Sequence, residues 1–245
     1  MKPALNENEP QVPASWQAFL QGPALAQAIS RQLQPWWQQI FGYYLLKVGD
    51  LSSDLDLPGC NIKNQVRLGS SDNGKSHLIG LPDTLPIDSH SIDAVLLSQC
   101  LEYQADPHHI VREAHRVLIS DGYLLLTGFN PVSLLALVGI APWLKQRYPW
   151  QGRFFSPGRI KDWLHLIGFE VLAEQRFFYG SMLVNEYADS SVQRFAEQYL
   201  NYFAGCYLLV ARKRELPLTP IRQRWQLAPA FADGVKGVSA RQGCR

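Results

Sequence analysis

A glycine that ends an apolar run is the first feature that could support chemistry. Residues 44–54 read YLLKVGDLSSD, so Gly49 follows a stretch with the composition of a buried strand. Glycine has no Cβ and lets the backbone approach a phosphate or a nucleoside closely. The positions where a nucleotide-cradling loop would carry two more glycines hold Leu51 and Ser53. Two interpretations stay open: a ligand-binding loop that has changed, or a turn that binds nothing.

Small and polar residues also follow other apolar runs. Gly69 and Ser70 follow NQVRL, Ser98 and Gln99 end the run IDAVLLSQ, and Asn130 follows YLLLTGF. In open parallel sheets, ligands bind beyond the carboxyl ends of the strands. These turns are therefore the candidate positions for a site.

The elements that would position these turns alternate between strands and helices. Apolar residues recur at helical spacing from Leu25 to Ile40, interrupted by Pro35, which is expected to kink or split that helix. Asp106-Pro107 and Ser156-Pro157 have the composition of helix starts, and Gly168 that of a helix end. The strands are apolar throughout, which is typical of a parallel sheet covered on both faces. The pattern predicts an α/β fold with an open, mostly parallel sheet and helices on both faces.

Composition narrows the class of protein. The chain has 245 residues, 47% hydrophobic and 18% charged, as in an ordinary globular domain. Its four cysteines fit neither a zinc site nor a disulfide framework, and residues 1–10 have no apolar core of a signal peptide. The longest apolar run, at 132–144, is too short to span a bilayer. We therefore expect a cytoplasmic protein with reduced thiols, no membrane span and no metal site.

Charge and periodicity suggest the domain boundaries. Residues 1–14 read as a flexible lead-in and 15–211 as the folded domain, with a candidate lid at 132–155 and an inserted amphipathic helix at 190–204. A buried helix pair is the alternative for the lid. Residues 212–245 hold eight Lys/Arg against two Asp/Glu, a net +6, and are expected to be a disordered tail. Such a tail could contact nucleic acid or an acidic partner, or could simply aid solubility.

Several motifs occur together in a recognisable order. After the strand that ends at Gly49 come LPDTLPIDSHSIDAV at 81–95 and EAHRVLISDGY at 113–123. In this order and spacing they resemble the class I S-adenosylmethionine-dependent methyltransferases, in particular the type 11 methyltransferase-domain family. The resemblance covers residues 15–211. It implies a Rossmann-like sheet of seven strands, S-adenosyl-L-methionine as cofactor and a methyl acceptor that is a small molecule.

The resemblance also implies which residues would bind the cofactor. Only the first glycine of the family's loop is kept, the acidic residue that ends the second strand is replaced by Gly69-Ser70, and Leu81 stands where a carboxylate usually bonds adenine. The implied cofactor-binding residues are Gly49, Asp50, Leu51, Ser53, Gly69, Ser70, Leu81, Pro82, Ser98 and Gln99. With so many departures, the alternative is a non-catalytic, methyltransferase-like module that serves in binding or interaction.

Methyl transfer from a sulfonium needs little acid–base machinery, so no catalytic triad is expected. If the alignment holds, Glu102 and Tyr103 after the fourth strand and Asn130 after the fifth would face the acceptor. The structural alternatives are that Tyr103 anchors its loop and that Asn130 only forms the turn before Pro131.

Overall fold

A seven-stranded sheet forms the centre of the computed structural model, which describes residues 11–70, 76–139, 141–144, 146–179 and 201–215. The strands are β1 (Tyr44–Val48), β2 (Asn64–Gly69), β3 (Leu78–Ile79), β4 (Ile92–Ser98), β5 (Leu118–Phe129), β6 (Phe169–Phe177) and β7 (Cys206–Lys213). Their order is β3-β2-β1-β4-β5-β7-β6, and only the pairings of β7 with β5 and β6 are antiparallel. The predicted fold, a Rossmann-like, mostly parallel sheet of seven strands, is confirmed.

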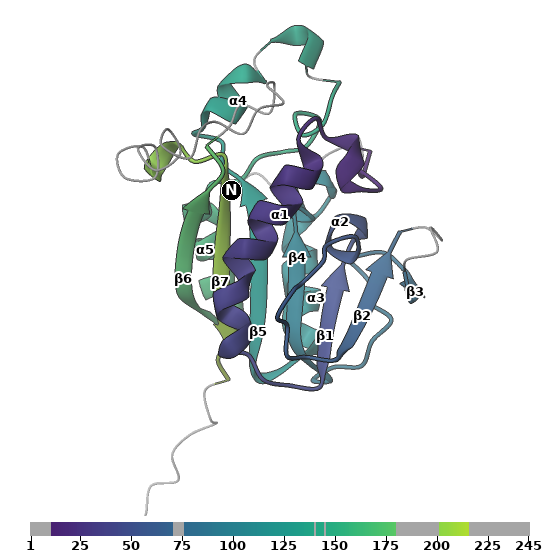
Figure 1. Cartoon of the computed structure of the whole chain (residues 1–245). Helices are drawn as coiled ribbons and strands as arrows, with labels where there is room; N and C mark the ends of the chain where they lie inside the picture. The colour runs from purple at the N-terminus through teal and green to yellow at the C-terminus, as the bar shows by residue number, and fades with distance from the viewer. Residues whose placement is uncertain (1–10, 71–75, 140, 145, 180–200, 216–245) are drawn as a thin grey trace, which may run out of the picture. The chain divides into compact units, whose positions relative to one another are not determined.

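Helices cover both faces of this sheet (Figure 1). The α-helices are α1 (Gly22–Leu33), α2 (Asp50–Ser53), α3 (Pro107–Val117), α4 (Leu134–Val138) and α5 (Pro157–Ile167). Short 3-10 turns are η1 (Trp16–Ala18), η2 (Gln34–Gln38), η3 (Leu101–Tyr103), η4 (Pro142–Leu144) and η5 (Asn201–Phe203). In Figure 1, α1 lies in front of the sheet, while α3 and α5 lie behind it.

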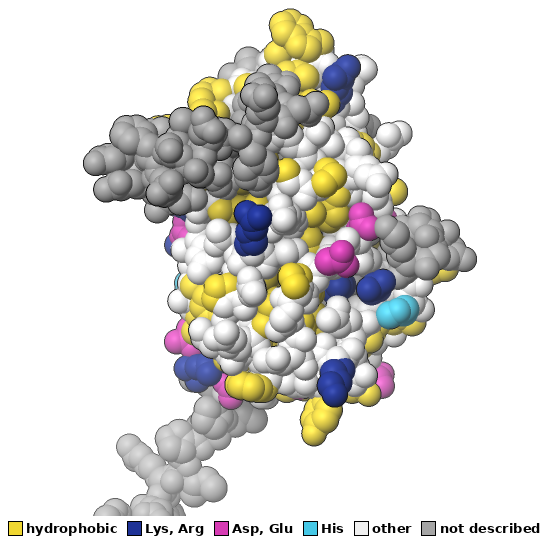
Figure 2. Space-filling model, viewed as in Figure 1, with side chains coloured by type: hydrophobic (Ala, Val, Ile, Leu, Met, Phe, Trp, Pro, Cys, Tyr) yellow, Lys and Arg dark blue, Asp and Glu magenta, His cyan; other side chains and the backbone are white. Residues whose placement is uncertain are grey.

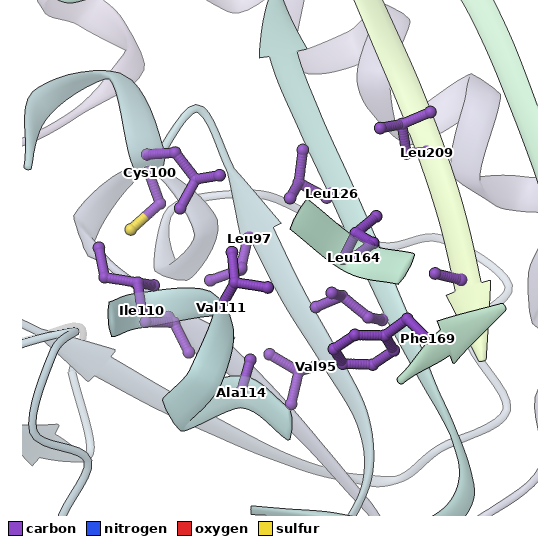
Figure 3. Packing of buried hydrophobic residues seen from close by; sticks show 14 of the residues in the cluster. Val95, Leu97, Cys100, Ile110, Val111, Ala114, Leu126, Leu164, Phe169 and Leu209 are labelled. Atoms are coloured by element: carbon purple, nitrogen blue, oxygen red, sulfur yellow. The ribbon is translucent and has the colours of Figure 1, made fainter. Parts of the chain in front are cut away.

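Alternate residues of the central strands pack into two separate cores. In β4, Ala94 and Leu96 join the cluster that contains α1, whereas Val95 and Leu97 join the one that contains α3 and α5. Figure 3 shows Val95 and Leu97 beside the side chains of α3. Because successive side chains of a strand point to opposite faces, a strand covered on both sides must be apolar throughout. This explains the unbroken apolar runs in the sequence.

The predicted ends of the helices are largely confirmed. The Asp106 carboxylate accepts hydrogen bonds from the backbone N–H groups of His108 and His109, and Gly168 ends α5 with a φ of 107°. At Pro35, α1 gives way to the 3-10 turn η2. Strand β5 includes Asp121, whose φ of 61° is uncommon for a residue other than glycine.

The C-terminal boundary of the folded part lies beyond residue 211. Strand β7 continues to Lys213, whose buried ammonium donates to the Leu118 carbonyl at 2.8 Å and pairs with Glu215 at 2.9 Å. These contacts hold the chain to the body as far as Glu215. The tail beyond it, residues 1–10 and most of the predicted helix at 190–204 lie outside the described residues, and the described end of that helix is the turn η5.

The candidate lid, residues 132–155, contains α4 and η4. Leu135 and Phe155 are buried, whereas Leu137 and Trp143 are 59% and 75% exposed, so the segment is not simply a buried helix pair. Figure 2 shows hydrophobic side chains gathered at the top of the view, where this segment lies. Its role as a lid remains a prediction. Across the part of the chain that is described, no helix has the length and apolarity needed to cross a membrane.

Candidate functional site

A hollow opens at the carboxyl ends of four neighbouring strands. Its cavity has a volume of only about 20 Å³, enough for about one water molecule. Its walls come from the residues that follow β1, β2, β3 and β4, and from the N-terminal segment: Val12, Gly49, Asp50, Leu51, Ser70, Pro82, Ser98, Gln99, Cys100 and Gln104. The hollow therefore lies where the strand order reverses between β1 and β4, which is the usual ligand position in such sheets.

Gly49 shapes the floor of this hollow. Its backbone has φ 87° and ψ 160°, a region that essentially only glycine occupies. The Gly49 N–H donates to the Leu68 carbonyl at 2.9 Å, which fixes the end of β1 against β2. The short helix α2 that follows Gly49 is held against the end of β4, because the Ser98 N–H donates to the Ser52 hydroxyl at 2.8 Å. The loop after β1 is thus held open in one defined shape.

Asp50 brings a carboxylate to the end of β2. Its Oδ2 accepts from the Ser70 hydroxyl at 2.5 Å, and its Oδ1 accepts from the Ser70 N–H at 3.2 Å. A Cβ on Gly69 would lie 2.7 Å from Asp50 Oδ1, so glycine at that position makes room for the carboxylate. The acidic group that the sequence lacks at the end of β2 is therefore supplied from the loop after β1.

The side-chain amide of Gln99 is hydrogen-bonded through its oxygen but not through its nitrogen among the described residues. Its Oε1 accepts from the hydroxyls of Ser98 at 2.7 Å and Thr127 at 3.0 Å. Gln99 is fully buried and lines the hollow. Its Nε2 has no hydrogen-bond partner among the described residues. The backbone there has a φ of 44°, uncommon for a non-glycine residue. An unpartnered buried donor costs free energy, which a ligand acceptor would recover.

The segment before α1 closes one side of the hollow. Val12 lines it, and the Trp16 indole N–H donates to the Leu51 carbonyl at 3.0 Å. On the far side, the Tyr148 hydroxyl donates to the Gln11 carbonyl at 3.1 Å. The segment thus bridges the loop after β1 and the loop after η4, and in Figure 1 it lies beside α2. Residues 11–14, expected to belong to a flexible lead-in, form part of the site wall.

Three of the predicted cofactor-binding residues do not line the hollow. Leu81 is 61% exposed, and its neighbour Pro82 takes the place in the wall. Ser53 is buried and its hydroxyl donates to the Leu68 carbonyl at 3.2 Å, so it ties α2 to β2. Gly69 faces Asp50 and Ser76. The other seven residues predicted to bind the cofactor are brought together as expected.

The three residues predicted to face the acceptor are buried instead. Glu102, Tyr103 and Asn130 are 1%, 2% and 3% exposed, and none lines the hollow. Asn130 Nδ2 donates to the carbonyls of Tyr202 at 3.0 Å and Ala204 at 2.9 Å, which ties β5 to the chain before β7. The Tyr103 hydroxyl donates to the Pro149 carbonyl at 3.3 Å. As the structural alternatives for Tyr103 and Asn130 stated, both hold loops in place.

Glu102 is anchored in the same way. Its Oε1 accepts from the Phe129 N–H at 2.9 Å, and its Oε2 has no partner in the described part of the chain. Burial raises the pKa of this carboxyl to about 7. Its place behind the wall of the hollow, with its side chain toward the end of β5, argues against direct contact with an acceptor.

Val12, Cys100 and Gln104 are wall residues that the sequence did not single out as cofactor contacts. Burial, with smaller contributions from Glu102 and Asp50, raises the pKa of the Cys100 thiol strongly. The thiol therefore stays protonated and is a poor nucleophile. The described residues contain no group of three or more His, Cys, Asp or Glu side chains that could hold a metal ion.

The polar groups of the hollow suit a nucleoside with a charged amino-acid end. A carboxylate at the end of β2 can accept from hydroxyls, and the Gln99 amide can donate to a carboxylate or carbonyl. The cavity is far smaller than a small-molecule site, with room for about one water molecule. We therefore expect the segment around Val12 to shift when a ligand of this size enters.

Comparisons with known proteins point the same way. A family model described as "Methyltransferase domain" matches residues 58–126. The Escherichia coli (strain K12) protein YafS is 36% identical over 232 residues, which cover 91% of each chain.

Solved structures share the architecture. A methyltransferase from Thermotoga maritima, described as a possible histamine N-methyltransferase, covers 82% of this chain and 99% of its own at a TM-score of 0.53 and 17% identity. An S-adenosylmethionine-dependent methyltransferase from Mesorhizobium loti covers 81% and 100%, at a TM-score of 0.53 and 15% identity. At these identities the likeness establishes the fold.

Proposed function

Because the chain is a relative of YafS and belongs to the class I S-adenosylmethionine-dependent methyltransferase family, we propose that it binds S-adenosyl-L-methionine and transfers a methyl group to a small molecule. One observation carries the proposal. Seven residues that the family pattern assigns to the cofactor surround one hollow at the carboxyl edge of the sheet, and one of them, Gln99, has a buried amide nitrogen with no partner among the described residues.

Each wall residue has a role that follows from its geometry. Gly49 lets the backbone approach the ligand, and Asp50 is placed to hold hydroxyl groups at the end of β2. Gln99 is placed to donate to the amino-acid end, while Leu51 and Pro82 supply apolar surface. S-adenosyl-L-methionine, when bound, supplies a methyl group on a sulfonium that is already activated for transfer. The protein then needs to align the acceptor and exclude water rather than to move protons at a triad.

Binding of the cofactor is the first expected result. At about 100 times its dissociation constant, S-adenosyl-L-methionine or S-adenosyl-L-homocysteine should stabilise the fold by about 2.7 kcal/mol, seen as a higher Tm. Adenosine triphosphate serves as a control nucleotide and should shift the Tm less. If millimolar cofactor leaves the Tm unchanged, the hollow has lost its ligand and the domain is a methyltransferase-like binding module.

Asp50→Asn tests the carboxylate that replaces the usual acidic residue of β2. The amide keeps the shape but removes the charge that accepts from hydroxyls, so we expect the cofactor to bind about tenfold more weakly, or about 1.4 kcal/mol. Asp56→Asn is the control, because Asp56 is exposed and does not line the hollow. Isothermal titration of both variants measures the difference. Equal affinities in the two variants would remove Asp50 from the site.

A cytoplasmic location, the lid role of residues 132–155 and a partner for the basic tail remain predictions. The tail lies beyond the described residues, so the proposed reaction is argued from residues 11–215 alone.

A further inference from the structure

A cluster of cationic and aromatic side chains joins the starts of α3 and α5. The His108 ring lies 3.8 Å from the Trp163 ring, centroid to centroid. The Arg159 guanidinium lies over Trp163 at 5.3 Å and over Phe155 at 5.9 Å. The Arg153 guanidinium also lies over the Phe155 ring, at 5.6 Å from its centroid. We call these residues, together with Arg112, the α3–α5 cationic cluster.

Two of the guanidinium groups of this cluster have no ion-pair partner among the described residues. Arg112 and Arg159 are exposed and take part in no ion pair among the described residues. Asp106 is one carboxylate near the cluster in sequence, and its Oδ1 is already engaged by two backbone N–H groups of α3. Asp162 lies one turn after Arg159 in α5 and forms no ion pair with it among the described residues. Burial, Arg112 and Arg159 all lower the pKa of His108, against the opposing effect of Asp106. The two guanidinium groups thus create a positive field at the His108 ring.

The β4–α3 loop connects the cluster to the hollow, although no residue of the cluster lines the hollow. Gln104 of that loop lines the hollow, and Asp106, two residues on, caps α3. The Arg153 N–H donates to the Glu102 carbonyl at 2.8 Å, which fixes the cluster to the same loop. One loop therefore links the wall of the hollow to the start of α3, where the cluster lies.

We propose that the α3–α5 cationic cluster binds a phosphate group, and that the methyl acceptor carries this group. Guanidinium forks match phosphate oxygens in geometry, and aromatic surfaces behind them hold the guanidinium planes in place. A phosphate carries about −1.5 to −2 charges at neutral pH and so matches two free guanidinium groups better than a carboxylate does. The statement that this phosphate belongs to the methyl acceptor rests on the proposed function. The binding of phosphate to the cluster does not, because it does not require the cofactor.

The His108 ring reports directly on this site. We expect inorganic phosphate at millimolar concentration to raise the pKa of His108, followed by NMR of the ring protons, because the anion offsets the two guanidinium charges. In Arg112→Gln/Arg159→Gln the pKa should already be higher and phosphate should no longer change it. Arg31→Gln removes an exposed guanidinium from α1 on the other face of the sheet and should behave like the wild type.

Two further measurements separate the possible outcomes. Glycerol phosphate and vesicles of phosphatidylglycerol are compared as sources of the group: a response to the first assigns a soluble phosphate ester, and a response to vesicles alone assigns a lipid headgroup. A His108 pKa that none of the phosphate sources changes overturns the proposal. The Tm shift with S-adenosyl-L-methionine is measured in parallel, so loss of cofactor binding with phosphate binding intact would refute only the proposed methyltransferase activity.

Discussion

Gly49→Val is expected to abolish the Tm shift that S-adenosyl-L-methionine causes in the wild-type protein. Valine cannot adopt φ 87° with ψ 160° without strain of about 1–3 kcal/mol, so the loop after β1 would change shape. A Cβ at this position would already lie 3.4 Å from Cys100 Sγ, on the wall of the hollow, and the methyl groups of valine would fill the space that the ligand needs.

The matched control is Gly59→Val. Gly59 also has a positive φ, of 79°, but it is exposed, does not line the hollow, and a Cβ there would meet no atom within 4 Å. This variant should lose stability and keep cofactor affinity. Calorimetric titration of both variants, with far-UV circular dichroism to verify folding, makes the comparison. A folded Gly49→Val variant with wild-type affinity would show that the cofactor does not approach this backbone.

Glu102→Gln is expected to stabilise the protein above neutral pH. Burial raises the pKa of Glu102 from 4.5 to about 7. Below the unfolded value of 4.5 the carboxyl is protonated in both states. Between the two values the folded state keeps a proton that the unfolded state has released, so the free energy of unfolding falls as pH rises. Above about pH 7 the loss is complete, at about 3 kcal/mol.

Glu102→Gln removes this loss of folding free energy, because the glutamine side chain does not ionise in this pH range. The oxygen of the new amide can still accept from the Phe129 N–H, so packing at the end of β5 is kept. We expect urea unfolding to give a variant about 3 kcal/mol more stable than the wild type at about pH 8 and similar at about pH 4. Glu113→Gln is the control of opposite sign: its carboxylate pairs with Arg116 at 2.8 Å, which lowers its pKa, so its loss should destabilise. A pH-independent difference for Glu102→Gln would contradict the assigned protonation.

The agreement between the predicted and observed folds has local causes. Helix starts at Asp106 and Ser156 were readable because a side-chain oxygen must cap the first free N–H groups, and the structure contains both caps. The apolar runs of β1, β4 and β5 were readable because strands buried on both faces admit few polar residues. The C-terminal boundary was set too early because the buried ammonium of Lys213 reads as a surface charge until its partners are known.

The sequence predicted the roles of individual site residues less well than it predicted the fold. Glu102 and Asn130 look like polar loop residues open to a substrate, but both are buried. Glu102 is bonded to the backbone of β5, and Asn130 to the backbone of the segment before β7. Leu81 has the right position relative to the Leu-Pro step, yet its side chain faces solvent and Pro82 forms the wall. Position along a strand end indicates proximity to a ligand, while the direction of a side chain depends on the local backbone and its neighbours.

From its sequence alone, this chain determines a mostly parallel sheet covered on both faces, and a site at the carboxyl edge near Gly49, because periodicity, caps and strand-end glycines act over a few residues. The tertiary structure alone decides that the Asp50 carboxylate lies at the end of β2 and that Val12 closes one side of the hollow. It also decides that the Gln99 amide nitrogen has no hydrogen-bond partner among the described residues. These features join segments that are distant in the sequence, and only the packing of the sheet and its covering segments brings such segments together.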